Sequence, residues 1–299
     1  MNILRDFLEH MVDYAGLFPP ARLDMKTAFH NYHTYRDSLE SWMLGSFIVP
    51  FSRLAEMEDE AGDRIGAASE ESPFRCSLIA GPRPDAAALG LAAFNGKYRL
   101  SGNGAGAVVE AVECKADTIE EIRSLAGLFP EDVAVFVEIP WGKEAGGLIG
   151  ALAEANLNAK VRTGGIVPDL YPPAAGLLNF IWACHLSGVP FKATAGLHHP
   201  VRSRHPITYE PGAPQEMMFG FLNVFLAAAF IREGMDRGEA GRLLEETDPS
   251  AFEFDEEGGG WRGNRLNGAR LLNARKFAVS FGSCSFEEPL EDLKRLKWL

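Results

Sequence analysis

The sequence is poor in cysteine and has no apolar run long enough to span a bilayer. Its four cysteines form no CxxC pair, so we expect reduced thiols in a cytoplasmic protein rather than disulfides. The longest apolar run, Met217–Ile231, has fifteen residues and contains Asn223, whereas a membrane span needs roughly 20. We therefore expect a buried or subunit-interface helix there, no membrane partner, and a chain able to form a homo-oligomer.

The sequence also lacks a signal-peptide pattern and a basic cluster. Asp6, Glu9 and Asp13 fall where the apolar core of a signal peptide would lie. Lys and Arg number 29 against 41 Asp and Glu, which gives a net charge of −12. The densest basic stretches, 202–205 and 294–297, are short and have acidic neighbours. A chain of this charge repels phosphate backbones, so no nucleic-acid partner is expected.

What is present is an ordinary globular composition, with 46% hydrophobic and 23% charged residues. Eight short segments rich in β-branched, aromatic or small residues predict strands at 11–18, 46–51, 74–80, 107–115, 133–139, 159–164, 191–196 and 277–284. Helical patterns fill the intervals at 25–44, 53–63, 85–94, 118–128, 143–155, 173–187, 216–234 and 288–298. Thr118 and Glu121 match a capping box at the start of one helix.

Eight strands that each precede a helix are typical of a closed (β/α)8 barrel, or TIM barrel. We therefore predict an α/β fold with a single barrel over residues 1–299; an open doubly wound sheet is the alternative. The loop after the seventh strand is extended, because residues 200–276 hold a long helix and then a Gly/Asp/Glu-rich insertion at Glu245–Gly263. This insertion is expected to act as a lid over the barrel mouth or as a subunit contact.

Charged residues are predicted on the inner face of the barrel. Strand residues alternate between the two faces, and in four of the later strands the apolar set is the one suited to pack under helices. Lys160, Arg162, Lys192 and Glu138 then point toward the axis. Buried charges are costly unless they are paired or used, so this pattern predicts either a structural ion-pair layer or a reactive site.

The predicted strand at 107–115 leaves two parities open. Either Glu113 and Lys115 or Glu110 would face the axis. Lys160 and Lys192 lie on neighbouring strands, which are about 4.8 Å apart, so two ammoniums at the same height repel. That repulsion would lower the pKa of one lysine and leave a neutral amine, which is how a Schiff-base lysine is prepared.

Short motifs on these strands resemble a known family. The carriers are Lys160–Gly164 (KVRTG), a helix ending in Gly188-Val189, Phe191–Gly196 (FKATAG) and Ser280–Ser285 (SFGSCS). Deoxyribose-phosphate aldolases are similar, with a K-x-x-T-G strand, a helix ending in G-V, an F-K-x-x-G-G strand and a final F-G-x-S-S turn. Val12–Ala15 (VDYA) also resembles that family's first-strand I-D-H-T. The resemblance covers mainly 159–200 and 277–295, about a fifth of the chain.

The resemblance implies that Lys160 forms the imine and that Lys192 tunes its pKa. It also implies a phosphate or substrate cradle made by Gly164, Gly165, Gly196, Gly282, Ser283 and Ser285, with Asp13 on the first-strand motif. The sequence departs from the family at Leu197, where the family has a second glycine. No residue matches the family's catalytic aspartate, for which Glu113 and Glu138 are the inward candidates.

Further departures are His198-His199-Pro200, which the family lacks, and Arg162, which replaces a small residue and suits a carboxylate or phosphate. We expect a Schiff-base, aldolase-like carbon–carbon lyase acting without a cofactor on a small carbonyl substrate, with or without a phosphate group. Lys160 would attack the carbonyl, Lys192 would keep it deprotonated, and Glu138 or His198 would move protons. Arg162 and the turn at 282–285 would hold the anionic end.

Two alternatives remain open at this level. A metal-dependent hydrolase or isomerase would use His198, His205 and Glu138 or Glu113 as ligands, although no HxH or HExxH spacing is present. A non-catalytic barrel would keep the charges as a plug and work as a binding or scaffold protein. Cys284 at a strand end is a candidate nucleophile, but a packed thiol is the expected state.

Overall fold

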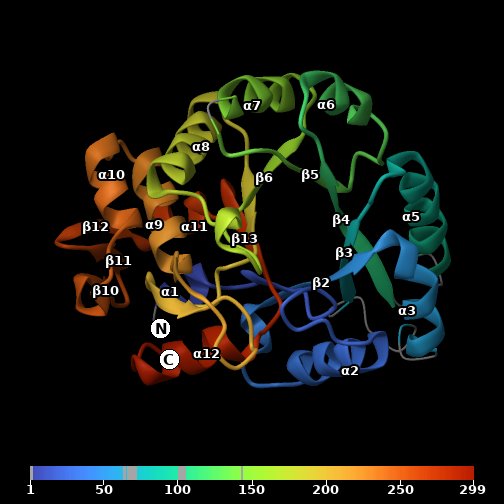
Figure 1. Cartoon of the computed structure of the whole chain (residues 1–299), viewed down its shortest axis with the longest axis horizontal. Coiled ribbons are helices and arrows are strands. Elements are labelled where there is room, and N and C mark those ends of the chain that lie inside the picture. The colour runs from blue at the N-terminus through green and yellow to red at the C-terminus, as the bar shows by residue number, and fades with distance from the viewer. Residues whose placement is uncertain (1–2, 63–64, 66–72, 100–105, 143) are drawn as a thin grey trace.

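Eight parallel strands close into a barrel, as the alternation of strands and helices predicted (Figure 1). The structure is a computed structural model that describes residues 3–62, 65, 73–99, 106–142 and 144–299. The order around the ring is β1-β13-β7-β6-β5-β4-β3-β2, so the open-sheet alternative is wrong. The barrel strands are β1 (Val12–Tyr14), β2 (Leu44–Pro50), β3 (Phe74–Ile79), β4 (Ala107–Lys115), β5 (Ala134–Glu138), β6 (Asn158–Arg162), β7 (Phe191–Thr194) and β13 (Ala278–Ser283).

Helices cover the outside of this ring (Figure 1). They are α1 (Ile3–Phe7), α2 (Met25–Arg36), α3 (Leu54–Ala61), α5 (Pro84–Arg99), α6 (Ile119–Leu125), α7 (Ala145–Glu154), α8 (Ala174–Ser187), α9 (Phe221–Arg232) and α12 (Glu287–Arg295). The predicted capping box at Thr118 and Glu121 starts α6. The predicted helix at 25–44 stops at Arg36, because the chain turns through a 3-10 segment, Ser41–Met43, into β2. Lys143, where another predicted helix starts, lies outside the described residues.

The helix predicted at 216–234 begins later than expected. Gln215–Met218 is strand β9, which pairs antiparallel with β8 (Ser203–Pro206) as a hairpin, and α9 starts only at Phe221. In the hairpin these residues form hydrogen bonds between strands with the backbone N–H and C=O groups that would otherwise bond within a longer helix. Its residues 205–210 and Met218 line the cavity described below, so the hairpin covers part of the barrel mouth.

The insertion at 245–263 does not lie over the mouth. It contains β10 (Phe252–Phe254) and β11 (Gly258–Trp261), which form a small antiparallel sheet with β12 (Asn264–Asn267), between α10 (Arg237–Leu244) and α11 (Gly268–Ala274). The sheet contacts α1 and α11, and the Ile3 amide donates to the Asp255 carbonyl oxygen at 3.1 Å. None of its residues lines the cavity, so the expected lid is wrong for this segment.

The long apolar run is a core helix. Almost every residue of α9 is buried, and Phe221 and Phe225 pack against Phe281 on β13 with ring centroids 5.3 and 6.0 Å apart. Asn223 is fully buried but satisfied, because it donates to the Leu243 and Glu246 carbonyl oxygens and accepts from the Arg202 amide. Within the part of the chain that the structure describes, no helix is long and apolar enough to cross a membrane.

A β-bulge in β4 decides which of its acids face the axis. Cys76 on β3 is opposite Val109, but the next residue, Ser77, is opposite Ala111, so Glu110 is the extra residue. An extra residue shifts the alternation of faces by one. Glu110 at the bulge and Glu113 after it therefore both point inward, which resolves the two parities left open by the sequence.

Candidate active site

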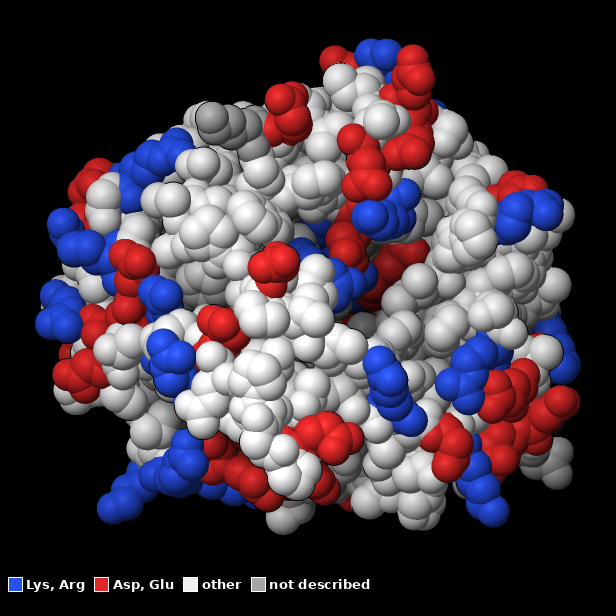
Figure 2. Space-filling model, viewed as in Figure 1, with Lys and Arg blue, Asp and Glu red and all other residues white. Residues whose placement is uncertain are grey.

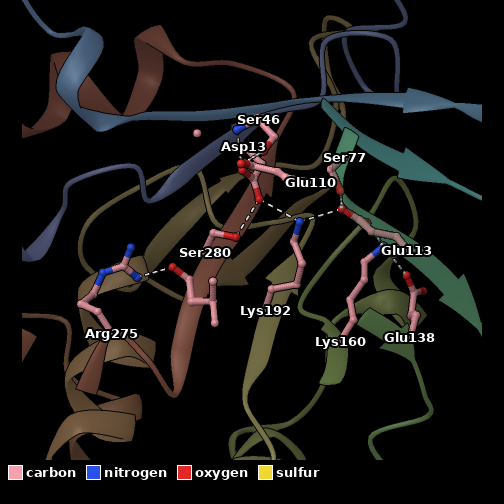
Figure 3. A network of polar contacts seen from close by, with 12 residues as sticks. Asp13, Ser46, Ser77, Glu110, Glu113, Glu138, Lys160, Lys192, Arg275 and Ser280 are labelled. Carbon is pink, nitrogen blue, oxygen red and sulfur yellow. Dashed lines mark hydrogen bonds and ion pairs between the residues drawn. The ribbon is translucent and has the colours of Figure 1, made fainter. Parts of the chain in front are cut away.

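One carboxylate joins the two interior lysines (Figure 3). Glu113 Oε1 lies 2.6 Å from Lys192 Nζ, and Glu113 Oε2 lies 2.7 Å from Lys160 Nζ. Ser77 Oγ donates to Glu113 Oε1 at 2.8 Å. The three charged side chains are almost completely buried, with exposed fractions of 1% for Glu113, 6% for Lys160 and 2% for Lys192. The Glu113 carboxylate thus pairs with both ammonium groups, which would otherwise repel each other.

Two further carboxylates complete the network. Lys192 Nζ also lies 2.7 Å from Asp13 Oδ2, and Lys160 Nζ lies 3.0 Å from Glu138 Oε2. Glu138 Oε1 accepts from Arg162 Nε at 3.0 Å. Three cations and three carboxylates therefore balance in this interior, which is the condition for burying charge at tolerable cost.

The register of the strands accounts for this arrangement. Lys160 and Lys192 are direct partners across β6 and β7, and Glu138 is the partner of Lys160 across β5 and β6. The prediction that both lysines face inward at one height is confirmed. Phe136, two residues before Glu138 on β5, lies with its ring centroid 5.4 Å from Lys192 Nζ.

The repulsion between the two lysines was expected to lower the pKa of one of them, and Lys192 does not show this effect. Burial alone would lower the pKa of Lys192, but Asp13 and Glu113 outweigh burial and raise it above its ordinary value. Burial would likewise raise the pKa of Glu113, yet Lys160 and Lys192 hold it well below its ordinary value. The pKa of Glu138 is lowered in the same way, by Lys160 and Arg162 against the effect of burial.

A cavity of about 1060 Å³ opens above this network at the carboxyl ends of the strands, where TIM barrels carry their sites. Figure 2 shows a hollow at the centre of this face with charged side chains inside it. Lys160, Glu113, Glu138 and Arg162 line the cavity, whereas Lys192 does not. Lys160 is therefore the buried lysine that a bound molecule would meet, and Lys192 lies behind it.

The close packing of β6 against β7 requires glycine at two of the positions that were expected to cradle an anion. A Cβ on Gly164 would lie 2.8 Å from the Gly196 Cα, and Gly196 has a positive φ of 74°. The ends of β6 and β7 therefore approach more closely than side chains would allow. Gly165, Gly196 and Gly282 line the cavity.

The serines of the final turn are engaged within the turn. Ser283 Oγ donates to the Ser285 carbonyl oxygen at 2.7 Å, and Ser285 Oγ accepts from the Glu288 amide at 3.1 Å. Neither serine is among the residues that line the cavity. Asp13, also expected at the substrate, is instead held by Lys192, by Ser280 Oγ at 2.6 Å and by the Ser46 amide at 2.8 Å.

The histidines after β7 pair with acids of α12. His198 Nδ1 lies 2.7 Å from Glu288 Oε2, and His199 Nδ1 lies 2.7 Å from Asp292 Oδ2. The rings of His199 and His205 stack with centroids 3.4 Å apart. Among the described residues no group of three or more His, Cys, Asp and Glu side chains is placed to hold a metal ion, so His198, His205 and Glu138 are not assembled as a ligand set.

Sequence reasoning missed the two α12 acids and the hairpin aromatic Tyr209. Glu288 and Asp292 are four residues apart, which places them on one face of the helix, and two adjacent histidines precede them in the chain. That spacing was a usable signal. No sequence signal marked Tyr209, because Cys284, whose sulfur lies 3.6 Å from the Tyr209 hydroxyl, is distant from it in the chain.

Cys284 lies at the cavity as a buried thiol. Burial is the main effect that raises its pKa, which opposes formation of the nucleophilic thiolate. All four cysteines are buried and free.

No known family model matches this sequence, and no curated protein matches it. The TIM-barrel fold and the geometry of its charged interior are therefore the basis on which function is argued.

Proposed function

We propose that this barrel is a Schiff-base, aldolase-like carbon–carbon lyase in which Lys160 binds the carbonyl substrate covalently. The observation that carries the proposal is the unequal placement of the two lysines. Lys160 is at the cavity floor between Glu113 and Glu138, while Lys192 is held behind it by Asp13 and Glu113. TIM barrels are commonly enzymes, although the fold alone assigns no reaction.

In the proposed reaction Lys160 first gives a proton to Glu138 and attacks the substrate carbonyl carbon as a neutral amine. The carbinolamine then loses water, with Glu138 returning the proton to the leaving hydroxyl. The product is an iminium, which carries the positive charge that the ammonium had before. Glu113 and Glu138 therefore stabilise the iminium as they stabilised the ammonium.

The iminium withdraws electrons from the neighbouring carbon–carbon bond. A base removes the proton of the β-hydroxyl, and the carbon–carbon bond breaks. An aldehyde leaves, and an enamine remains attached to Lys160. Protonation of the enamine and addition of water release the second product and restore the amine. His198 lines the cavity with Nδ1 against Glu288, which orients the ring for proton transfer at its other nitrogen.

Borohydride trapping tests the covalent step. The protein is incubated with acetaldehyde or pyruvate, reduced with borohydride, digested and mapped by mass spectrometry. We expect a reduced adduct on Lys160 that is lost in Lys160→Met and retained in Lys276→Met, a substitution of an exposed lysine. Absence of a Lys160 adduct with every aldehyde and ketone tried, or labelling of Lys160 no faster than of Lys276, would overturn the proposal in favour of a structural ion-pair plug.

The positioning role of Lys192 has a separate readout. In Lys192→Met, Glu113 keeps Lys160 as its remaining cation, so Lys160 holds its proton more tightly. The pH at which Lys160 labelling reaches half its maximum is expected to rise relative to wild type. An unchanged pH profile would show that Lys192 does not act on Lys160.

A further inference from the structure

The cavity is much larger than the reacting carbonyl requires. Its volume of about 1060 Å³ is at the upper end of the roughly 300–1,000 Å³ typical of pockets for drug-sized ligands. The paired side chains of Lys160, Glu113, Glu138 and Arg162 are at the floor, and many of the other lining side chains are apolar. These include Phe18, Ile79, Ile166, Leu170, Ile207 and Met218.

The cations that line the cavity are already neutralised. Among its described lining residues the lysine and arginine side chains are Lys115, Lys160 and Arg162. The lining also holds His205 and two histidines, His198 and His199, that are paired with Glu288 and Asp292. Lys115 pairs with Asp117 at 3.3 Å, and Lys160 and Arg162 pair with the floor carboxylates.

Acids outnumber these cations in the same lining. The acidic side chains are Glu113, Asp117, Glu121, Glu138, Glu210 and Glu288, against three lysines and arginines. A phosphate entering this cavity would have to displace an existing partner to gain a counter-ion, and it would meet surplus negative charge.

The turn that resembles a phosphate-binding loop is also unsuited to an anion. The Glu288 amide at the start of α12 donates to Ser285 Oγ, and the Ser285 amide donates to Ser283 Oγ at 3.3 Å. Both backbone N–H groups are therefore already hydrogen-bonded to serine side chains of the turn. The Glu288 carboxylate lines the cavity at the same place, so the site would repel a phosphate group.

We propose that the substrate is an uncharged carbonyl compound with an extended apolar portion, and that phosphorylated carbonyl compounds are poor substrates. The carbonyl carbon meets Lys160 at the floor, and the apolar portion lies against the walls that include Ile166 and Leu170. This inference rests on the proposed Schiff-base function and narrows its substrate class, replacing the phosphorylated substrate that the sequence motifs suggested.

The test measures Lys160 adducts by borohydride trapping with matched probes. Hexanal is compared with acetaldehyde for the apolar portion, and glyceraldehyde with glyceraldehyde 3-phosphate for the charge. Labelling of exposed Lys276 in the same sample corrects for the intrinsic reactivity of each probe. Because burial of the additional methylene groups of hexanal favours binding, we expect hexanal to label Lys160 at least about tenfold faster than acetaldehyde. Glyceraldehyde should label it faster than its phosphate.

Two adjacent substitutions locate the apolar subsite. Ile166→Asp places a charge on the cavity wall and is expected to lower the hexanal-to-acetaldehyde ratio about tenfold. Val167→Asp adds the same charge one residue away, outside the lining, and should leave the ratio unchanged.

The outcomes separate the two proposals. No Lys160 adduct with any probe overturns the Schiff-base function itself. Lys160 adducts that form as readily with acetaldehyde as with hexanal, or faster with the phosphorylated probe, leave that function standing and overturn the substrate class. Equal ratios for Ile166→Asp and Val167→Asp would also overturn it.

Discussion

Replacing Glu113 by Gln should expose how strongly one carboxylate holds this interior together. Glu113 is almost fully buried and makes two ion pairs, at 2.6 Å with Lys192 and 2.7 Å with Lys160. Removing one partner from a buried pair typically costs about 3–5 kcal/mol, because the other charge stays buried. Since Asp13 and Glu138 still pair with the lysines, we expect the free energy of unfolding at pH 7 to fall by about 3 kcal/mol, the lower end of that range.

The pH dependence of the free energy of unfolding gives a sharper test, because the lysine contribution is constant below about pH 10.4 in the wild type but not in Glu113→Gln. In the wild type the pKa of Lys192 is raised, so its stabilisation is complete below the unfolded lysine pKa of about 10.4 and is lost as pH rises further. In Glu113→Gln two ammoniums face each other, so the folded pKa of one falls below about 10.4. The unfolded variant then binds more protons, and the stability of the variant rises with pH up to that value.

Urea unfolding between pH 7 and 10, followed by tryptophan fluorescence, measures both quantities. Ser77→Ala is the control, because it removes a hydrogen bond to Glu113 and should cost about 1 kcal/mol without changing the slope with pH. The double variant Glu113→Gln, Lys192→Met should regain part of the lost stability. A loss below about 1 kcal/mol with a wild-type pH slope would refute the bridging role of Glu113.

Three further predictions concern other parts of the barrel. Gly196→Ala should lower the free energy of unfolding in urea by about 2–4 kcal/mol, because Gly196 has a positive φ and a Cβ there would overpack against Gly164. Gly188→Ala, where φ is also positive but the surrounding space is open, should lower it by only about 1–2 kcal/mol. Equal losses would contradict the close approach of β6 and β7. Burial, and after it the charge of His199, lower the pKa of His205 to about 4. As pH falls, His205 therefore gains its proton in the unfolded state before it does so in the folded state, and the free energy of unfolding should fall by about 1 kcal/mol from pH 7 to 5 after allowing for partial exposure. His205→Asn should remove this fall, measured from urea midpoints, and an unchanged fall would contradict the prediction. Cys284, whose pKa burial raises, should react with a thiol reagent at least about 100-fold more slowly in the native state than in urea, and similar rates would show an activated thiol.

The strands and the inward charges were predictable from local patterns. Each barrel strand is a short apolar segment bounded by helical patterns, and period-two alternation placed Lys160, Lys192 and Glu138 on one face. The register then follows from barrel closure, which brought the two lysines opposite each other. The aldolase-like motifs correctly marked these strands, although they do not by themselves assign a reaction.

Two of the partners of those charges, Glu113 and Asp13, were not predictable. The bulge at Glu110 breaks the strict alternation on which the strand analysis depends, so the sequence left Glu113 in doubt. The expected repulsion between the lysines ignored a carboxylate from two strands away. Asp13 was assigned to substrate because its motif position was visible, while its partner Lys192 is distant in the chain. The hairpin at β8 and β9 was misassigned because its second strand runs directly into the apolar helix α9.

The bulge in β4 also links the two ends of the barrel axis. Glu110 accepts from Arg75 at 2.8 Å and from Ser46 Oγ at 2.7 Å, and the Ser46 amide donates to Asp13. From Asp13 the contacts continue through both lysines to the cavity floor (Figure 3). The interior is thus a continuous polar column in place of the layers of branched aliphatic side chains usual in TIM barrels. We therefore expect a substitution at partly exposed Arg75, remote from the cavity, to alter the electrostatic environment of Lys160.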